Sequence, residues 1–311
     1  MTEDASSAPA LTALRVGIVG VGNMGLGMAG RLRDLGWELA VRDIDAERAR
    51  AAAALGATVC ASSAELAAAC DCVIVCVVDA TQTRTALFGE RGVMATLAPG
   101  SSVVLCPTIA PEDTERFARQ LARRGVACID APMSGGPARA RDGTMSLMVA
   151  CADAVFERHR ALVEALSAKV FRIGERPGDG ARTKLVNNLL AGINLAGACE
   201  VMALAERLGL DAARTLAVIE QSSGQSWIAS DRLRRAIAGD LAPRAHTTLL
   251  AKDTRLALDA ARGAGFEAVI GGMAAAAFAR ACEDGCASLD DASLLAWFRQ
   301  QGATASTDDT A

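Results

Sequence analysis

The sequence predicts an α/β protein with a doubly wound, mostly parallel β-sheet followed by an all-α C-terminal domain. In the first half of the 311-residue chain, short apolar runs alternate with amphipathic helical stretches. This is the pattern of parallel strands that are covered by helices on both faces. After about residue 180 the strand-like runs stop, and apolar residues recur at helical spacing.

Seven strands and the helices between them are expected in the first half. The strand candidates are residues 15–20, 38–42, 72–78, 102–106, 127–130, 146–150 and 169–173. Ser63 precedes one helical stretch, and Pro111 with two following acids opens another. Both are common ways for a helix to begin, so the strands are predicted to alternate with helices.

The second half is predicted to be helical throughout. A long helix at about residues 181–207 is followed by further helices to about residue 300, with glycine and proline breaks between them. We therefore expect an α/β domain at residues 14–179 and an all-α domain at residues 180–301. Residues 1–13 and 302–311 are polar or low in complexity and are expected to be flexible tails.

Composition and charge narrow the class of protein. The net charge of −4 argues against nucleic acid or an anionic membrane as the main partner. Residues 1–13 lack the positive start of a signal peptide, and no long uncharged apolar stretch occurs, so we expect a cytoplasmic protein without a membrane span. The ten cysteines show no CxxC pair and no metal-type spacing with the two histidines, which predicts buried free thiols and no metal site.

A glycine-rich turn follows the first predicted strand. Gly20, Gly22 and Gly25 have G-x-G-x-x-G spacing between that strand and a helix that opens near Asn23 and Met24. The first glycine permits a tight turn, the second lets the backbone approach a pyrophosphate, and the third lets helix and strand pack closely. The alternative is a glycine-rich turn without a ligand. The flanking elements favour a Rossmann-type dinucleotide site.

Asp43 ends the next predicted strand and bears on the choice of cofactor. A carboxylate there accepts hydrogen bonds from the adenosine ribose hydroxyls and repels a 2′-phosphate. A 2′-phosphate site would usually place an arginine just after this position, where Ile44 stands. Arg42 precedes Asp43, and strand alternation should direct it to the other face. The sequence therefore favours NAD over NADP.

Four blocks in this order resemble the β-hydroxyacid dehydrogenases, relatives of 3-hydroxyisobutyrate and 6-phosphogluconate dehydrogenases. They are GIVGVGNMGLGMA, DAPMSGGPARARDGT, GDGARTKLVNN and the Lys252-Asp253 pair in LLAKDTRLAL. The resemblance covers about residues 14–300, nearly the whole chain. It implies a Rossmann domain, an all-α substrate and dimerisation domain, and oxidation of a small hydroxy-carboxylate with transfer of its hydride to NAD.

Ser134, Gly135 and Gly136 form the candidate carboxylate site. They follow a predicted strand and offer a hydroxyl and exposed backbone N–H groups, which suit a carboxylate. The alternative is a plain turn. They match the family's substrate-binding D-A-P-V-S-G-G motif, so the resemblance implies substrate binding here.

Lys184 is the candidate catalytic residue, and Asn188 lies one turn later on the same predicted helix face. An ammonium partly withdrawn from water can take a proton from a hydroxyl as hydride leaves the carbon, although most helix lysines are simply solvated. In the family the matching lysine is the acid/base and the matching asparagine holds substrate. Lys252 matches the family's second lysine, near the nicotinamide and the substrate; it could equally pair with Asp253 or another acid on a helix surface.

Two cofactor loops depart from the family pattern. Where relatives commonly have Leu-Pro-Asn after the fourth strand, this chain has Val77 and Val78 before an aspartate. The usual D-x-S-T becomes Leu-Cys-Pro-Thr, so Thr108 keeps a hydroxyl while Pro107 cannot replace the serine. We expect Val77, Val78 and Thr108 to line the cofactor site.

Several stretches resemble the acid-sugar branch of the family, which oxidises C2 of a four-carbon aldonate such as L-threonate. They are VVDATQT, RIGERPGDG, LLAGINLAGACEVMALAERLGL and GQSW. Trp227 could close over the substrate, or it could be a buried packing residue. His-Gln often replaces Asn187-Asn188 in that branch, so a substrate of the 3-hydroxyisobutyrate or tartronate semialdehyde type is the alternative.

Imine reductases and non-catalytic NADH sensors are the alternatives to a hydroxyacid dehydrogenase. Imine reductases share this fold but usually lack a lysine at the position of Lys184, and a non-catalytic NADH sensor would have little use for the lysine–asparagine pair. The long helix is too apolar along LLAGINLAGACEVMAL for a solvent-facing side, as in relatives that dimerise here. We expect a homodimer or homotetramer.

Overall fold

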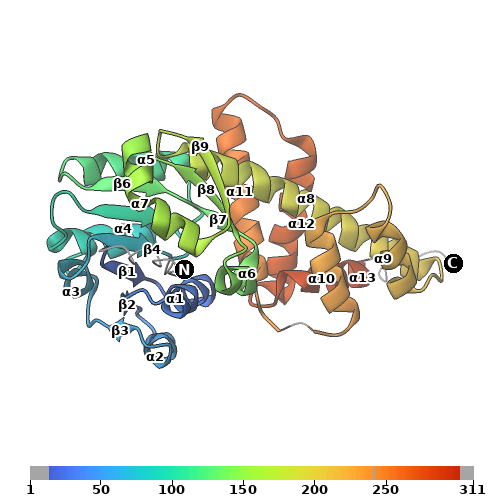
Figure 1. Cartoon of the computed structure of the whole chain (residues 1–311). Coiled ribbons are helices and arrows are strands. Elements are labelled where there is room, and N and C mark those ends of the chain that lie inside the picture. Colours follow the sequence, from blue (N-terminus) through green and yellow to red (C-terminus); the bar gives the residue numbers. More distant parts are fainter. Residues whose placement is uncertain (1–13, 241, 302–311) are drawn as a thin grey trace, which may run out of the picture. The chain divides into compact units, whose positions relative to one another are not determined.

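The computed structural model describes residues 14–240 and 242–301 and divides into two compact units, with the boundary between Lys184 and Leu185. The tails expected at residues 1–13 and 302–311 lie outside the described residues. The first unit is built on a nine-stranded sheet in the order β3-β2-β1-β4-β5-β6-β8-β7, and β9 pairs with β8 (Figure 1). An α/β fold with a helical C-terminal unit is therefore confirmed.

All seven predicted strands are present in the first unit. The strands are β1 (Val16–Val19), β2 (Leu39–Arg42), β3 (Thr58–Val59), β4 (Cys72–Val75), β5 (Ser102–Leu105), β6 (Ala127–Asp130), β7 (Met133–Ser134), β8 (Ser146–Ala150) and β9 (Lys169–Gly174). Strands β1 to β6 pair in parallel, β8 runs antiparallel to β6 and β7, and β9 runs parallel to β8. Sequence analysis missed β3 and β7, because two residues carry no periodicity.

Helices cover both faces of this sheet. The helices of the first unit are α1 (Asn23–Asp34), α2 (Ala46–Ala54), α3 (Ser63–Ala68), α4 (Ala80–Phe88), α5 (Pro111–Ala122), α6 (Gly136–Asp142) and α7 (Asp153–Leu166). Ile74 packs in a core cluster with residues of α1 and α7, and Val73 packs in a second cluster with residues of α3, α4 and α5. Because neighbouring residues of one strand are buried on opposite faces, the strand is apolar throughout.

The second unit is helical. It comprises most of α8 (Asp179–Arg207), then α9 (Ala212–Glu220), α10 (Trp227–Ile237), α11 (Thr247–Gly263), α12 (Val269–Ala281) and α13 (Leu294–Gln301). Its core gathers Leu195, Met202, Phe278 and Trp297 from three of these helices. Among the described residues α8 alone has the length and apolar composition of a membrane span, and 44% of that apolar window is buried inside the structure. Core helices of globular proteins pass the same test.

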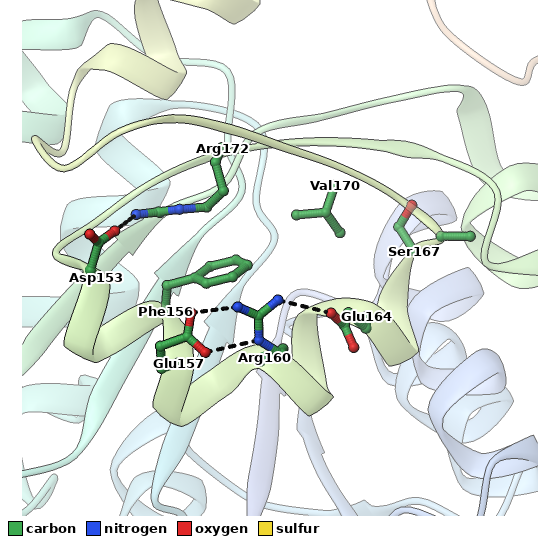
Figure 2. A pocket seen from close by; sticks show the side chains of 9 residues that line it. Asp153, Phe156, Glu157, Arg160, Glu164, Ser167, Val170 and Arg172 are labelled. Atoms are coloured by element: carbon green, nitrogen blue, oxygen red, sulfur yellow. Dashed lines mark hydrogen bonds and ion pairs between the residues drawn. The ribbon is translucent and has the colours of Figure 1, made fainter.

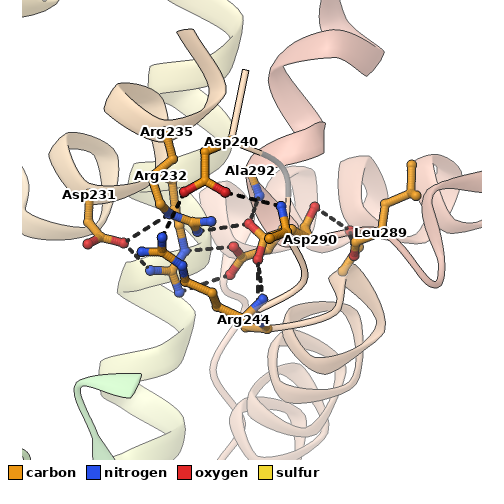
Figure 3. Close-up of polar contacts among 12 residues, drawn as sticks. Asp231, Arg232, Arg235, Asp240, Arg244, Leu289, Asp290 and Ala292 are labelled. Carbon is orange, nitrogen blue, oxygen red and sulfur yellow. Dashed lines mark hydrogen bonds and ion pairs between the residues drawn. The ribbon is translucent and has the colours of Figure 1, made fainter. Parts of the chain in front are cut away.

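A network of buried ion pairs ties α10 to the segment before α13 (Figure 3). Asp290 is fully buried and accepts a hydrogen bond from the Arg235 guanidinium at 2.8 Å. Arg232 pairs with the neighbouring Asp291 at 2.6 Å. Buried charges are tolerated only when they are paired, so each partner depends on the other.

We predict that Asp290→Ala lowers the free energy of unfolding by about 3–5 kcal/mol, because it leaves the Arg235 charge buried without this partner. Urea unfolding followed by circular dichroism measures the change. The matched control is Asp259→Ala on α11, whose side chain is 45% exposed and pairs with Arg262, and which should change stability by less than about 1 kcal/mol. Equal effects of the two substitutions would contradict a stabilising role for the buried network.

Candidate active site

The glycine-rich turn joins β1 to α1 at the carboxyl edge of the sheet. Gly20 has a φ of +93°, and a Cβ there would lie 2.4 Å from the Cys76 carbonyl oxygen. A Cβ on Gly25 would lie 2.0 Å from the Gly20 carbonyl oxygen, so the helix can pack this closely only with glycine. Gly22 caps α1 without a side-chain hydrogen bond, which leaves the first N–H groups of the helix, at Asn23 and beyond, directed at the turn.

Asp43 lies directly after β2 and is bonded to the same turn. Its two carboxylate oxygens accept hydrogen bonds from the Val21 N–H at 2.7 Å and the Asp45 N–H at 2.9 Å. The side chain is 6% exposed, whereas Ile44 is 93% exposed. The Arg42 guanidinium donates to the Asp43 carbonyl oxygen, so it stays beside the residue that follows it. The turn and the acidic strand end thus form one hydrogen-bonded unit.

Loops after the neighbouring strands lie at the same edge of the sheet. Val77 and Val78 follow β4, and Thr108 follows β5; both strands run parallel to β1. The Val78 N–H donates to the Gln82 side chain at 3.1 Å, which ties the loop to the first turn of α4. Because parallel strands end at a common edge, the fold brings these residues to the side of the sheet that holds the glycine-rich turn.

Ser134, Gly135 and Gly136 form a sharp connection from β7 to α6. Gly135 and Gly136 have φ values of +132° and +79°, a region that favours glycine. A Cβ on Gly135 would also lie 2.9 Å from the Arg139 side chain. Gly135 caps α6 without a side-chain hydrogen bond. This connection therefore places Ser134 next to the backbone N–H groups at the start of a helix.

Asp130 at the end of β6 holds the first turn of α8, a role that sequence analysis missed. Its Oδ2 accepts hydrogen bonds from the Gly178 N–H at 2.7 Å and the Ala181 N–H at 3.1 Å. Burial raises the pKa of this carboxyl to about 6, although the backbone N–H donors act to lower it. The available signal was an acidic residue that ends an apolar strand, directly before the loop that carries Ser134, Gly135 and Gly136. The bond fixes the helix that carries Lys184.

Lys184 and Asn188 are both buried, 6% and 9% exposed, one turn apart on α8. In the second unit the Asn188 side-chain N–H donates to Asp253 Oδ2 at 2.6 Å. Lys252 Nζ lies 2.7 Å from Asp253 Oδ1, so Lys252 pairs with its neighbour, one of the two alternatives open at the sequence level. Asn187 is exposed, and its side-chain N–H donates to the Asn188 side-chain amide oxygen at 3.0 Å. Sequence analysis did not assign Asp253 a part in the site.

Trp227 is the first residue of α10. It is 44% exposed, and the Ser226 hydroxyl caps its helix by accepting from the Ala229 N–H. A half-exposed tryptophan at a helix start leaves a large apolar face for contact with another surface.

One pocket of the first unit lies away from the predicted site residues. A pocket of about 550 Å³ lies between α7 and β9, and contains none of the predicted site residues (Figure 2). Arg172 in it pairs with Asp153, and Arg160 pairs with Glu157, so its charges are satisfied. Among the residues that the structure describes, no three His, Cys, Asp or Glu side chains are grouped to hold a metal ion.

The fold and the glycine-rich turn with its acidic partner define the class of nicotinamide-dinucleotide-binding oxidoreductases. Residues 15–174 match the family model for the NAD binding domain of 6-phosphogluconate dehydrogenase. Residues 178–298 match the model described as NAD-binding of NADP-dependent 3-hydroxyisobutyrate dehydrogenase. The chain therefore belongs to the 3-hydroxyisobutyrate dehydrogenase-like family of hydroxyacid dehydrogenases, and the resemblance seen in its sequence is confirmed.

Individual relatives span nearly the whole chain. An L-threonate dehydrogenase from Cupriavidus necator is 35% identical over 91% of this chain and 95% of its own. A mitochondrial 3-hydroxyisobutyrate dehydrogenase from Bos taurus is 30% identical over 92% of this chain and 87% of its own. The crystal structure of 3-hydroxyisobutyrate dehydrogenase from Salmonella typhimurium has a TM-score of 0.86 at 33% identity, covering 91% of this chain and 99% of that one.

The buried Asp130 carboxyl predicts a pH dependence of stability. Its folded-state pKa of about 6 is raised above the ordinary value of 3.8, so the stability it contributes is present below about pH 4 and is lost as pH rises through 6. Asp130→Asn should remove this loss, changing the difference in unfolding free energy between variant and wild type by about 1–3 kcal/mol between pH 3 and 7. Urea unfolding at several pH values measures it.

A parallel experiment uses Asp291→Asn in the second unit. Burial also raises the pKa of Asp291 to about 6, so this variant should remove a separate share of the same pH dependence. The two shares should add, since the residues lie in different units. A pH profile of Asp130→Asn parallel to that of wild type would show that Asp130 does not titrate in this range.

Proposed function

We propose that this chain oxidises a small hydroxy-carboxylate and transfers its hydride to NAD, with Lys184 as the general acid/base. The observation that carries the proposal is the buried position of Lys184, one turn before the buried Asn188 on α8. A lysine withdrawn from water seldom serves as a solvated surface charge. Membership in a family of hydroxyacid dehydrogenases supports the same chemistry.

The residues of the first unit fit a bound dinucleotide. The close approach at Gly20 and Gly25 leaves the start of α1 open to a pyrophosphate, which Gly22, Asn23 and Met24 would meet. Asp43 would accept from the ribose hydroxyls, and Val77, Val78, Thr108 and Lys252 are the remaining proposed contacts. NAD, when bound, supplies the hydride acceptor.

The chain's own residues would prepare the substrate for that transfer. The Ser134 hydroxyl and the N–H groups of Gly135 and Gly136 bind the carboxylate, and Asn188 orients the hydroxyl. Lys184 accepts the hydroxyl proton as the carbonyl forms, and it returns a proton in the reverse direction. Trp227 contacts the apolar side of the substrate.

An acid sugar such as L-threonate is the first substrate proposed, because an L-threonate dehydrogenase is 35% identical along nearly the whole chain. A 3-hydroxyisobutyrate or tartronate semialdehyde type of substrate is the alternative, supported by the mitochondrial relative and by the Asn187-Asn188 pair. A spectrophotometric screen of aldonates and 3-hydroxyacids with NAD and NADP separates the two.

The protein is also proposed to act as a homodimer or homotetramer. Large apolar side chains are exposed along α8 and α12, including Leu190 at 57%, Leu204 at 54% and Met273 at 69%. Such faces are costly to leave in water, and a second copy would cover them. A cytoplasmic location stays a prediction.

Lys184→Met should lower kcat by about 100- to 10,000-fold, the usual contribution of a general acid/base, because methionine keeps the shape but cannot accept a proton. NADH binding, measured by fluorescence titration, should stay within twofold. The matched control is Lys169→Met at an exposed position of β9, which should retain wild-type turnover. Turnover that survives in Lys184→Met would show that another group moves the proton.

The proposed NAD preference rests on Asp43. Asp43→Asn removes the charge that repels a 2′-phosphate, and a hydrogen bond to a charged group is worth about 1.5–3 kcal/mol. The ratio of kcat/KM with NAD to kcat/KM with NADP should therefore fall by about 10- to 100-fold. An unchanged ratio would mean that other residues select the cofactor. Asp45→Asn, two residues later, is the control and should leave the ratio unchanged.

A further inference from the structure

Asp253 is the shared acceptor of a buried cluster in the second unit. Its carboxylate accepts the Asn188 side-chain N–H at Oδ2, 2.6 Å away, and lies 2.7 Å from Lys252 Nζ at Oδ1. Asp253 is 6% exposed and Asn188 9% exposed. One carboxylate oxygen thus binds an amide and the other pairs with an ammonium, both in a buried setting. Such contacts to a charged acceptor are stronger than contacts to a neutral acceptor.

The packing of α8 against α11 leaves this cluster little freedom. Gly192, one turn after Asn188, faces Thr254, the neighbour of Asp253, and a Cβ on Gly192 would lie 2.7 Å from the Thr254 methyl group. Thr254 is fully buried and its hydroxyl donates to the Leu250 carbonyl oxygen at 2.7 Å. The α8 backbone at Gly192 therefore packs closely against the Thr254 side chain, beside the Asn188–Asp253 hydrogen bond, which limits movement of either side chain.

The carboxylate also determines which way the Asn188 amide points. An ionised carboxylate only accepts hydrogen bonds, so it must face the amide nitrogen and not the amide oxygen. The oxygen in turn accepts from the Asn187 side chain at 3.0 Å. An amide nitrogen has two N–H groups, so Asn188 has one N–H beyond the one that it donates to Asp253.

We propose that Asp253 is a positioning residue, which orients the Asn188 amide and the Lys252 ammonium so that both donate to the oxygens of the hydroxy-carboxylate. Asp253 acts through these two side chains and does not itself bind substrate, because a second carboxylate would repel it. It also balances the Lys252 charge before substrate enters. This inference rests on the proposed function. It adds the residue that orients the side chains donating hydrogen bonds to the substrate.

The test is a double-mutant cycle on Asp253→Asn and Asn188→Ala, measured as kcat/KM for the best hydroxy-carboxylate found in the screen. Asp253→Asn should lower kcat/KM by about 10- to 100-fold, the cost of losing a hydrogen bond to a charged group. In the Asn188→Ala background the same substitution should cost at least about fivefold less, because the amide it orients is absent. A structural role elsewhere would give the same cost in both backgrounds.

Controls separate this inference from general damage. Circular dichroism at the assay temperature should show that Asp253→Asn is folded, while its melting temperature should fall because Lys252 loses a buried charged partner. Asp259→Asn, an exposed acid on the same helix, should leave kcat/KM unchanged. If Asp253→Asn fails to fold, Asp253→Glu replaces it in the cycle; it keeps the charge but moves the carboxylate by one methylene, so it should still lower kcat/KM.

The outcomes distinguish the two levels of the proposal. Turnover in wild type and loss of turnover in Lys184→Met, together with equal costs of Asp253→Asn in both backgrounds, would overturn the role of Asp253 alone. An Asp253→Asn variant with wild-type kcat/KM would do the same. A wild-type protein that turns over no hydroxy-carboxylate with either dinucleotide would overturn the proposed function, and this inference with it.

Discussion

The hydrogen bonds from the first turn of α8 to the buried Asp130 carboxylate are the interaction on which the arrangement of the candidate site depends. They attach the helix that carries Lys184 to the end of a sheet strand, with donor–acceptor distances of 2.7 and 3.1 Å. A long helix held only by apolar contacts can slide along its axis or rotate, whereas directional bonds at its first turn specify its register. The position of Lys184 relative to the sheet follows from that register.

The same kind of interaction recurs at other proposed site residues. Asp43 binds the glycine-rich turn, Asp130 binds the start of α8, and Asp253 binds Asn188 and Lys252. Each is a buried carboxylate that accepts N–H groups from a segment distant in sequence. Desolvation makes such a carboxylate costly, and the hydrogen bonds offset that cost only in one geometry. These acids therefore fix the geometry of the groups that they bind more than they stabilise the fold.

The arginine–aspartate network of α10 differs in that respect. Asp290 and Asp291 pair with Arg235 and Arg232, and none of these residues belongs to the candidate site. Because each aspartate is paired with an arginine, the network carries little net charge. It can therefore connect α10 to the segment before α13 inside the second unit. This chain therefore uses buried acids in two ways, as acceptors for backbone or amide N–H groups and as partners of arginine.

The sequence by itself determined the fold class, all seven longer strands and the dinucleotide turn, because a sheet buried on both faces needs continuous apolar runs and the turn at Gly20 and Gly25 admits only glycine. It also paired Lys184 with Asn188, since helical spacing is a local property. Tertiary structure alone decided that Asp130 holds α8 and that Asp253 joins Asn188 to Lys252. Those partners are 48 and 65 residues apart, and no local pattern encodes which distant N–H group a buried carboxylate will meet.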